Sequence, residues 1–382
     1  MILRLLPLSL LAFSGAVQEW NAPPPPIAAP HAAAPSLSLV ELAPGEARCE
    51  GGPVAFARYE PPLPVAAFGT GANQLQPVTI SFRIDAQGRP LGIARMNPSP
   101  DALSPSRLFY SDDDLVPAFA TARFAPGERR NCTVRFEARK WSIADAPPPV
   151  VARYLVAPHP RQGGQQALFR RIHPADTDCM GAGSPKLRLR AYPAFEDIAI
   201  APGAWAYAMT AFDINAKGRP VNVRIVASDG NAALDRASIK AVRQTRYAHE
   251  ARHGCTYPYY RRSEATIAAP PPPEKSSMQP ADARCPEADT KWTSMPRLQF
   301  PAGFVQRRIE GWAIIAYDVA PWGEIGNVRV LRAEPADAFG YQARDIVRNA
   351  RQGSSPTGRS GCVDLVRFVM PNKGQEPAAT DS

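Results

Sequence analysis

Six cysteines are the residues of this 382-residue chain whose chemistry is most readily predicted. None of them belongs to a Cys-x-x-Cys pair, the spacing typical of redox motifs and many zinc sites. An even number of cysteines is typical of disulfides formed in an oxidising compartment, and free structural thiols are the alternative. Six cysteines can pair in many ways, so their pairing has to come from another feature of the sequence.

Three further clusters could bind a cation or a nucleic acid. His249, His253 and Cys255 could hold zinc if the segment were helical, because histidines four residues apart share a helix face. The acidic run at 112–114 could hold a harder cation, or it could lie at the positive end of a helix. The basic aromatic run at 257–262 could stack single-stranded bases, or it could be the edge strand of a sheet.

Composition and motifs give no support to an enzyme. The glycine-rich segments at 69–71 and 181–183 fail the dinucleotide-binding pattern, and 358–361 lacks the spacing of a nucleophile elbow. The net charge of +9 comes from arginines scattered along the chain, which favours a solvated surface near anionic lipid or cell wall over nucleic-acid binding. We therefore expect no catalytic residue, no cofactor, no metal, no nucleic acid and no small-molecule substrate.

The chain contains one segment three times, and this repetition selects a cysteine pairing. Residues 82–90 match residues 212–220, and residues 317–323 match the same segment again. In this register one cysteine precedes the first strand of each copy, and another follows its helix. We expect three disulfides within copies, Cys49 with Cys132, Cys179 with Cys255 and Cys285 with Cys362. Because Cys255 follows this register and the nearby histidines have no equivalents in the other copies, we expect no zinc there.

The second copy shows the expected secondary structure most clearly. Alternating side chains over 205–212 predict a strand, 215–218 a hairpin turn, and 221–225 the returning strand. From Leu234 apolar residues recur at helical spacing, and a last strand begins near Cys255. We predict an α+β fold of three tandem small domains, each a three-stranded antiparallel sheet with one helix on one face (β-β-α-β), closed by its disulfide. In the first copy, 101–111 is an insertion, and we expect the helix to start late, within 112–117.

Composition also predicts the boundaries. Residues 1–16 have the basic start, apolar run and small residues of a signal peptide. The proline runs at 147–149 and 270–273 predict extended, semi-rigid spacers. We expect a cleaved signal peptide at 1–16, a Pro/Ala-rich leader at 17–39, repeat 1 at 40–142, a linker at 143–168, repeat 2 at 169–263, a Pro-rich linker at 264–281, repeat 3 at 282–372 and a disordered tail at 373–382.

The second copy resembles the TonB C-terminal domain family. It has an aromatic-proline pair at Tyr192-Pro193, a strand and turn over 212–218, a Ser-x-Gly turn at 228–230, and a helix that leads to Arg246-Tyr247. The other copies carry parts of this pattern, and together they cover roughly three quarters of the chain. The resemblance implies a binding domain that captures a short segment of an outer-membrane transporter as an added strand beside its own last strand.

On this chain the corresponding edges would be residues 134–138, 257–261 and 366–369. The alternative is that these strands are core-forming, or are shielded by the leading segment and its disulfide. An exposed edge presents unpaired N–H and C=O groups to a guest strand, while side chains give selectivity. The candidate peptide-binding residues are Val366, Arg367, Phe368, Val369, Tyr257 and Tyr259.

We expect a periplasmic protein that binds peptide segments or envelope proteins, including outer-membrane transporters, by strand addition. The alternative is an energy transducer anchored in the inner membrane by an uncleaved helix. The N-terminal apolar run is shorter than the roughly 20 residues that such a helix needs. An envelope enzyme is a third possibility, supported only by the size of the chain.

Overall fold

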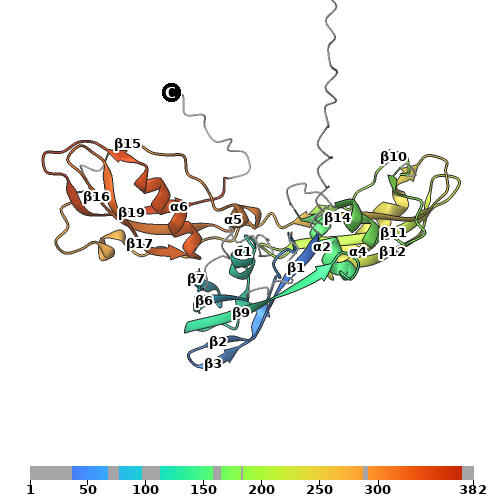
Figure 1. Ribbon diagram of the computed structural model, residues 1–382, viewed down its shortest axis with the longest axis horizontal. Helices are drawn as coiled ribbons and strands as arrows, with labels where there is room; N and C mark the ends of the chain where they lie inside the picture. Colours follow the sequence, from blue (N-terminus) through green and yellow to red (C-terminus); the bar gives the residue numbers. More distant parts are fainter. Residues whose placement is uncertain are drawn as a thin grey trace, which may run out of the picture. The chain divides into compact units, whose positions relative to one another are not determined.

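The computed structural model describes residues 37–67, 77–96, 112–157, 165–181, 184–286 and 291–371 (Figure 1). The predicted signal peptide, most of the leader, the insertion at 101–111 and the tail lie outside the described residues. Within these ranges, no helix is both long enough and apolar enough to cross a membrane. The fold is α+β, with several small antiparallel sheets and short helices. We use repeat 1 for 40–142, repeat 2 for 169–263 and repeat 3 for 282–372.

Repeat 2 contains the predicted order of strand, strand, helix and strand. Its central strand β11 (Trp205–Ile214) lies between β12 (Pro220–Ser228) and β14 (Arg252–Arg262). Helix α4 (Ala232–Gln244) packs on one face of this sheet, and the Asn231 side chain accepts the Leu234 N–H at its start. Because β11 is in the middle, β14 is an edge strand of its sheet.

Repeat 3 has the same arrangement. Strand β16 (Gly311–Val319) lies between β17 (Ile325–Glu334) and β19 (Arg359–Phe368), and helix α6 (Asp337–Arg348) covers one face. The short helix α5 (Ala302–Gln306) precedes β16. In this sheet, β19 is the strand that corresponds to β14.

Repeat 1 has the same pattern with a short helix. Strand β6 (Val78–Ile84) pairs with β7 (Pro90–Arg95) and with the long β9 (Arg129–Ser142), and α1 (Leu115–Ala120) starts within the expected range. Further strands extend this sheet: β1 (Ser38–Pro44), β2 (Ala47–Cys49), β3 (Gly52–Val54) and β5 (Val65–Ala67).

A short two-stranded ribbon accompanies each helix. In repeat 2, Gly218 in the hairpin turn has φ +68°, and a Cβ atom there would lie 2.3 Å from the carbonyl oxygen of Tyr247 in the ribbon. Glycine is required at this turn because the ribbon passes directly over it. The ribbons are β4 (Phe56–Arg58) with β8 (Arg123–Phe124), β10 (Leu187–Leu189) with β13 (Arg246–Tyr247), and β15 (Trp292–Ser294) with β18 (Arg351–Gln352).

The linker at 143–168 is not the extended spacer that we predicted. It contains helix α2 (Pro148–Val156) and the first half of α3 (Gln165–Ile172). The proline run does not prevent α2, because proline is tolerated in the first helical turn, where the N–H has no partner within the helix. Apolar residues of both helices pack with Tyr207 and Met209 of β11, on the face of the sheet opposite α4.

The linker at 264–281 also packs on a sheet. The Trp312 indole N–H donates a 2.6 Å hydrogen bond to the carbonyl oxygen of Pro270, and Ala269 and Met278 pack with Trp312 and Val363. The short 3-10 helix at Lys275–Met278 contacts β19. This linker therefore covers the face of the repeat 3 sheet opposite α6 instead of only spacing two domains.

Repeats 1 and 3 share one hydrophobic core. A single cluster contains Phe82 and Phe119 of repeat 1 together with Phe339 of repeat 3. At the border of this cluster, the Glu334 side chain is almost completely buried. Its carboxylate accepts a 2.7 Å hydrogen bond from the Gly92 N–H and forms an ion pair with Arg83. Repeats 1 and 3 therefore do not each have a separate core, as the expectation of tandem domains implied.

A buried ion pair also joins repeats 1 and 3. The Arg307 side chain is fully buried, and its Nε lies 2.6 Å from Oδ1 of Asp114. It also donates to the carbonyl oxygen of Gly203, at 2.9 Å, so the same guanidinium contacts repeat 2. Burial alone would lower the pKa of Arg307, but the negative charge of Asp114 and its hydrogen bonds outweigh this effect and raise it.

This pair changes our interpretation of the acidic run at 112–114. Asp114 precedes α1 but makes no side-chain cap hydrogen bond to it; its carboxylate accepts the Leu63 N–H and binds Arg307. Asp112 lies 2.7 Å from the guanidinium of Arg95. The carboxylates of Asp112 and Asp114 thus bind arginines and a backbone N–H. They do not cap the start of α1, as the alternative of a role at the positive end of a helix implied.

Candidate functional site

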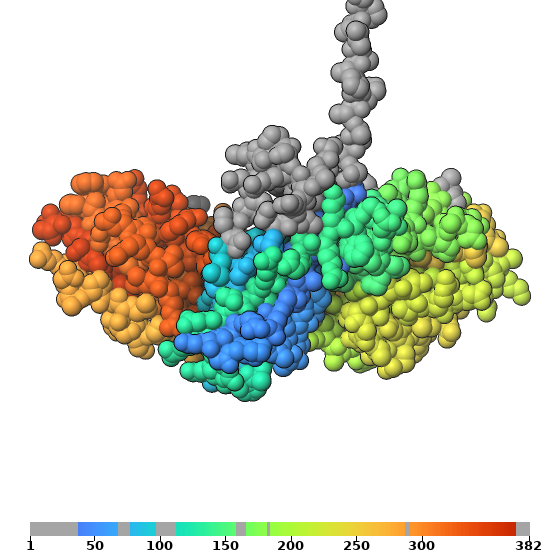
Figure 2. All heavy atoms as spheres, turned by 60° about the horizontal axis from the view of Figure 1, so that its bottom comes forward, coloured from blue at the N-terminus to red at the C-terminus, as the bar shows by residue number. Residues whose placement is uncertain are grey.

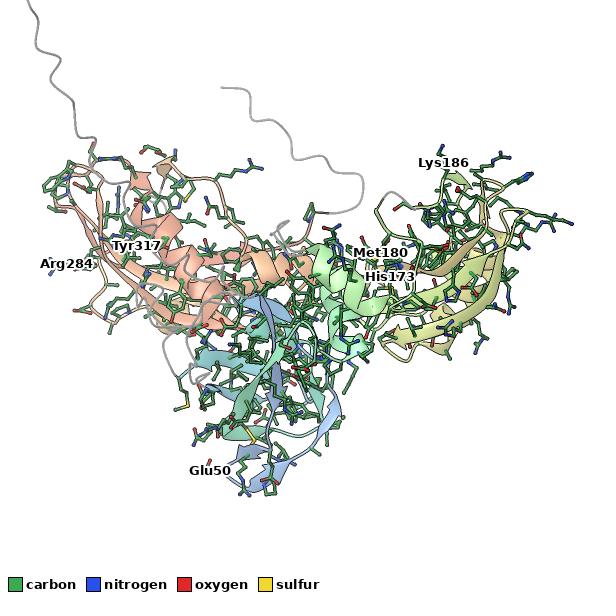
Figure 3. The ribbon with its side chains drawn as sticks, turned by 45° about the vertical axis from the view of Figure 1, so that its right-hand side comes forward. Glu50, His173, Met180, Lys186, Arg284 and Tyr317 are labelled. Atoms are coloured by element: carbon green, nitrogen blue, oxygen red, sulfur yellow. A yellow bond between two sulfur atoms is a disulfide. The ribbon has the colours of Figure 1, made fainter. Side chains whose placement is uncertain are left out.

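The disulfides attach the leading segment of each repeat to the start of its last strand. They join Cys49 to Cys132, Cys179 to Cys255 and Cys285 to Cys362, the pairs expected from the repeat register. In each repeat, the residue beside the leading cysteine donates its N–H to the second residue before the closing cysteine. These bonds are Glu50 to Arg130 and Asp178 to His253, both 3.2 Å, and Arg284 to Ser360, 2.9 Å. Figure 3 labels Glu50 and Arg284 among the side chains.

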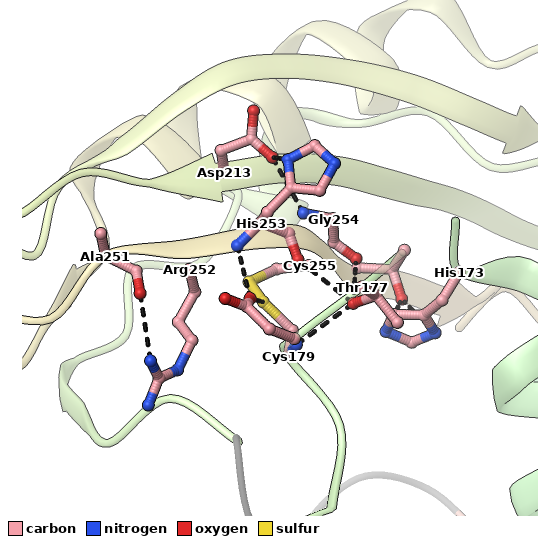
Figure 4. The surroundings of a disulfide bond; sticks show 11 residues. His173, Thr177, Cys179, Asp213, Ala251, Arg252, His253, Gly254 and Cys255 are labelled. Carbon is pink, nitrogen blue, oxygen red and sulfur yellow. Dashed lines mark hydrogen bonds and ion pairs between the residues drawn. A yellow bond between two sulfur atoms is a disulfide. The ribbon is translucent and has the colours of Figure 1, made fainter. Parts of the chain in front are cut away.

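In repeat 2 this attachment uses the residues that could have formed a zinc site (Figure 4). Cys255 is in a disulfide, and the two ring nitrogens of His253 lie 2.9 Å from Asp213 and 3.2 Å from Asp176. His249 is exposed. Among the described residues, no group of three or more histidine, cysteine or acidic side chains is arranged to hold a metal ion.

Hydrogen bonds strengthen this attachment. Thr177 Oγ1 donates to the carbonyl oxygen of Gly254 at 2.9 Å, and the Asp178 carboxylate accepts the His253 N–H. Burial would raise the pKa of Asp213, but the Gly254 N–H, the Asn222 amide and His253 outweigh it and lower that pKa. The leading segment therefore shields the beginning of the β14 edge, as the shielding alternative predicted.

Beyond Cys255, β14 is paired on one side only. Residues from Cys255 to Arg262 pair with β11 in continuous register, and no described strand pairs with their other side. Tyr259 is 2% exposed, and its hydroxyl donates to the carbonyl oxygen of Ala191. Tyr257 is half-buried beneath the Arg190 guanidinium, 3.7 Å from the ring centroid. The side chains of these two predicted binding residues pack in the core on the helix side of the sheet. The part of β14 that remains accessible to a guest strand is therefore its backbone edge.

Strand β19 presents a similar edge. Its residues pair with β16, and the described chain places no strand beside it after the Arg284–Ser360 bridge. Phe368 is fully buried against the rings of Phe339 and Phe300, so it belongs to the core. Of the other predicted residues, Val366 is half-buried, Arg367 is exposed, and Val369, just after the strand, is 61% exposed.

The third predicted edge, at residues 134–138, does not exist. Strand β1 pairs with β9 antiparallel from Ser38 opposite Ser142 to Pro44 opposite Phe136. The Gly45 N–H then donates to Arg135, and Arg48 pairs with Thr133. The paired strands lie side by side at the surface, blue and green in Figure 2. Our prediction was wrong because we did not predict a strand at 38–44, which fills this edge.

We did not predict from the sequence which residues of each last strand point their backbone N–H and C=O groups away from the central strand. Arg135, the third residue after Cys132, faces outward, because its carbonyl accepts the Gly45 N–H. The third residues after the other closing cysteines are Pro258 and Leu365. Proline is found in edge strands where its missing N–H would face away from the sheet. Pro258 could therefore have identified β14 as an edge strand, and also which of its residues turn their backbone groups outward.

The comparisons with known proteins fall on repeat 2. Residues 191–260 match the family model described as Gram-negative bacterial TonB protein C-terminal. Protein TonB of Escherichia coli (strain K12) is 35% identical over 72 residues, which are 19% of this chain and 30% of that protein. The chain therefore matches less than a third of the length of this relative. The matched segment contains β11, β12, α4 and most of β14. Residues 191–260 are therefore similar to the TonB C-terminal domain family.

Proposed function

We propose that this chain is an envelope protein that binds extended segments of other envelope proteins by strand addition to β14 and β19. The observation that carries the proposal is the one-sided pairing of these two strands beyond their closing cysteines. A guest strand would supply the missing hydrogen-bond partners, and the neighbouring side chains would select among guests. The similarity of residues 191–260 to the TonB C-terminal domain family supports partners in the envelope, with outer-membrane transporters as one class.

The three disulfides support the predicted location. Each closes a loop of more than 70 residues, and such bonds persist in oxidising compartments such as the periplasm. We propose that the chain works there as a binding protein. Its role is association with its partner and not catalysis.

Site-specific photo-crosslinking tests the proposal. A benzophenone amino acid at Tyr260 or Arg367, the fifth residue after each closing cysteine, should capture extended segments of envelope proteins in the native cell. Both side chains are exposed on the candidate edges. The matched control is Glu137, the fifth residue after Cys132, because β1 already covers that edge. The captured segments would be identified by mass spectrometry. Capture at Glu137 equal to that at the other two positions would contradict strand addition.

A backbone substitution separates strand addition from a merely adhesive surface. Pro258→Leu gives the β14 edge the N–H that Leu365 already supplies in β19. One more hydrogen bond, worth about 1 kcal/mol net, should increase capture at Tyr260 about five-fold. Capture at Arg367 in the same protein serves as the internal control and should stay unchanged. Equal capture at Tyr260 with and without the substitution would show that the guest does not pair with this edge.

A further inference from the structure

Strand β1 occupies in repeat 1 the position that remains unpaired in repeats 2 and 3. It runs antiparallel to β9, with its C-terminal end toward the Cys49–Cys132 disulfide. Its side chains are well packed: Leu39 is fully buried, Val40 is 1% exposed and Leu42 is 7% exposed. An added strand on the last strand of a repeat is therefore already present in this chain, with a defined direction and register.

The closing cysteines relate this register to the open edges. Counting from each closing cysteine, the fifth residue is Glu137, Tyr260 or Arg367, and the seventh is Arg139, Arg262 or Val369. Tyr260 lies opposite Tyr207 in β11. Arg367 lies opposite Trp312, the equivalent residue of β16. Tyr260 and Arg367 are therefore equivalent in structure as well as in sequence. Counting from the closing cysteines then transfers the partners of Glu137 and Arg139 in β1 to the other repeats.

At the seventh position, opposite charges face each other across β1 and β9. Glu41 of β1 lies opposite Arg139 in the register, while its carboxylate accepts the Trp141 indole N–H and lies 3.6 Å from Arg153. Arg262, the equivalent of Arg139 in repeat 2, is exposed. In repeat 3 the equivalent is the exposed, apolar Val369. The two open edges therefore differ in what they offer to a guest residue at the Glu41 position.

We propose that β1 is a built-in guest strand, so that repeat 1 is closed to partners, and that β1 shows which segments the open edges accept. This inference rests on the proposed function. The partner is an extended aliphatic segment that runs antiparallel to the last strand, with its C-terminal end toward the disulfide. Repeat 2 selects a carboxylate opposite Arg262, whereas repeat 3 selects an aliphatic side chain beside Val369.

A synthetic peptide with the sequence of Ser38–Pro44 tests the selectivity on the full-length protein. The photo-crosslinker at Tyr260 should capture this peptide about two- to five-fold more than the one at Arg367, the range for one opposite-charge cross-strand pair. A peptide carrying Glu41→Val should reverse this preference. Arg262→Ala should abolish the preference of repeat 2 for the acidic peptide. The same variant should still capture the Glu41→Val peptide at Tyr260, which is the control that it is folded.

The result that overturns the inference is distinct from failure of the proposed function. If native envelope segments are captured at Tyr260 and Arg367 but neither peptide is, or if Glu41→Val changes no ratio, β1 is not the template and the proposed function stands. If neither envelope segments nor peptides are captured at either position, both fail. Capture of the peptide at Glu137 would show that repeat 1 exchanges β1, and it would refute closure of repeat 1.

A covalent lock tests the closure directly. Ala43 lies opposite Glu137, and opposite residues in an antiparallel pair have Cα atoms about 4.5–5.5 Å apart, a separation that a disulfide can bridge. The double substitution Ala43→Cys/Glu137→Cys should therefore fix β1 on β9, with peptide mapping to verify the bond. We expect capture at Tyr260 and Arg367 to stay within two-fold of that of the unlocked protein. A large loss, reversed by reduction of the added bond, would show that guests enter at repeat 1.

Discussion

Replacement of Arg307 by alanine should lower the free energy of unfolding by about 3–5 kcal/mol. The guanidinium is fully buried and binds both Asp114 and the carbonyl oxygen of Gly203. Its removal leaves the Asp114 carboxylate without its charged partner at a buried border between repeats. An uncompensated charge in such a place is costly, because water cannot replace the lost partner.

The effect can be measured by urea denaturation followed by circular dichroism, with all disulfides intact. Arg344→Ala is the matched control, since the Arg344–Asp345 pair is exposed and such pairs contribute about 0–1 kcal/mol. Arg307→Ala/Asp114→Ala should recover part of the loss, because it removes the unpaired charge as well. If Arg307→Ala and Arg344→Ala had equal effects, the buried pair would not hold repeats 1 and 3 together.

Removal of the Cys285–Cys362 disulfide should cost a similar amount, about 4–5 kcal/mol on the chain-entropy model. The bond joins residues 77 positions apart in the sequence. Without it, the unfolded chain gains much conformational entropy. The native state also loses an anchor, because Arg284 is held beside Ser360 at the start of the β19 edge. The variant Cys285→Ala/Cys362→Ala removes both thiols and so prevents mispairing.

Denaturation of this variant should be compared with that of Thr357→Ala, a change in an exposed loop near the same strand. Hydrogen exchange of β19 gives a second measurement, which should rise first around Ser360. Unchanged stability together with unchanged exchange would mean that the leading segment is held without the bond. The disulfide would then not be the reason why the leading segment covers the beginning of β19.

Local patterns in the sequence predict the strands, turns and helix of each repeat well. The alternation over 205–212 lies in β11, and at the expected turn residue Gly218 a Cβ atom would collide with the ribbon. Cysteine pairing followed from repetition, because equivalent positions in equivalent folds must meet equivalent partners. These features depend on neighbours in the sequence, or on a register that recurs along it.

The features that sequence analysis missed depend on contacts between distant residues. The β1 to β9 pairing joins Ser38 to Ser142, and Arg307 meets Asp114 across 193 positions. Nothing near Ser38 or Arg307 in the chain signals these partners. The candidate tyrosines illustrate the same limit, since alternation identifies a strand but does not tell which face the core occupies, and Tyr259 proved to be buried.

The packing of both linkers changes where a truncated version of this protein should begin. A fragment that starts at residue 282 would leave Trp312 without its Pro270 acceptor and would uncover an apolar sheet surface. A fragment that starts at 169 would likewise strip Tyr207 of its contacts with α2. The smallest pieces worth expressing therefore start upstream, near Ala265 and Ala146, so that each repeat keeps the stretch that covers the second face of its sheet.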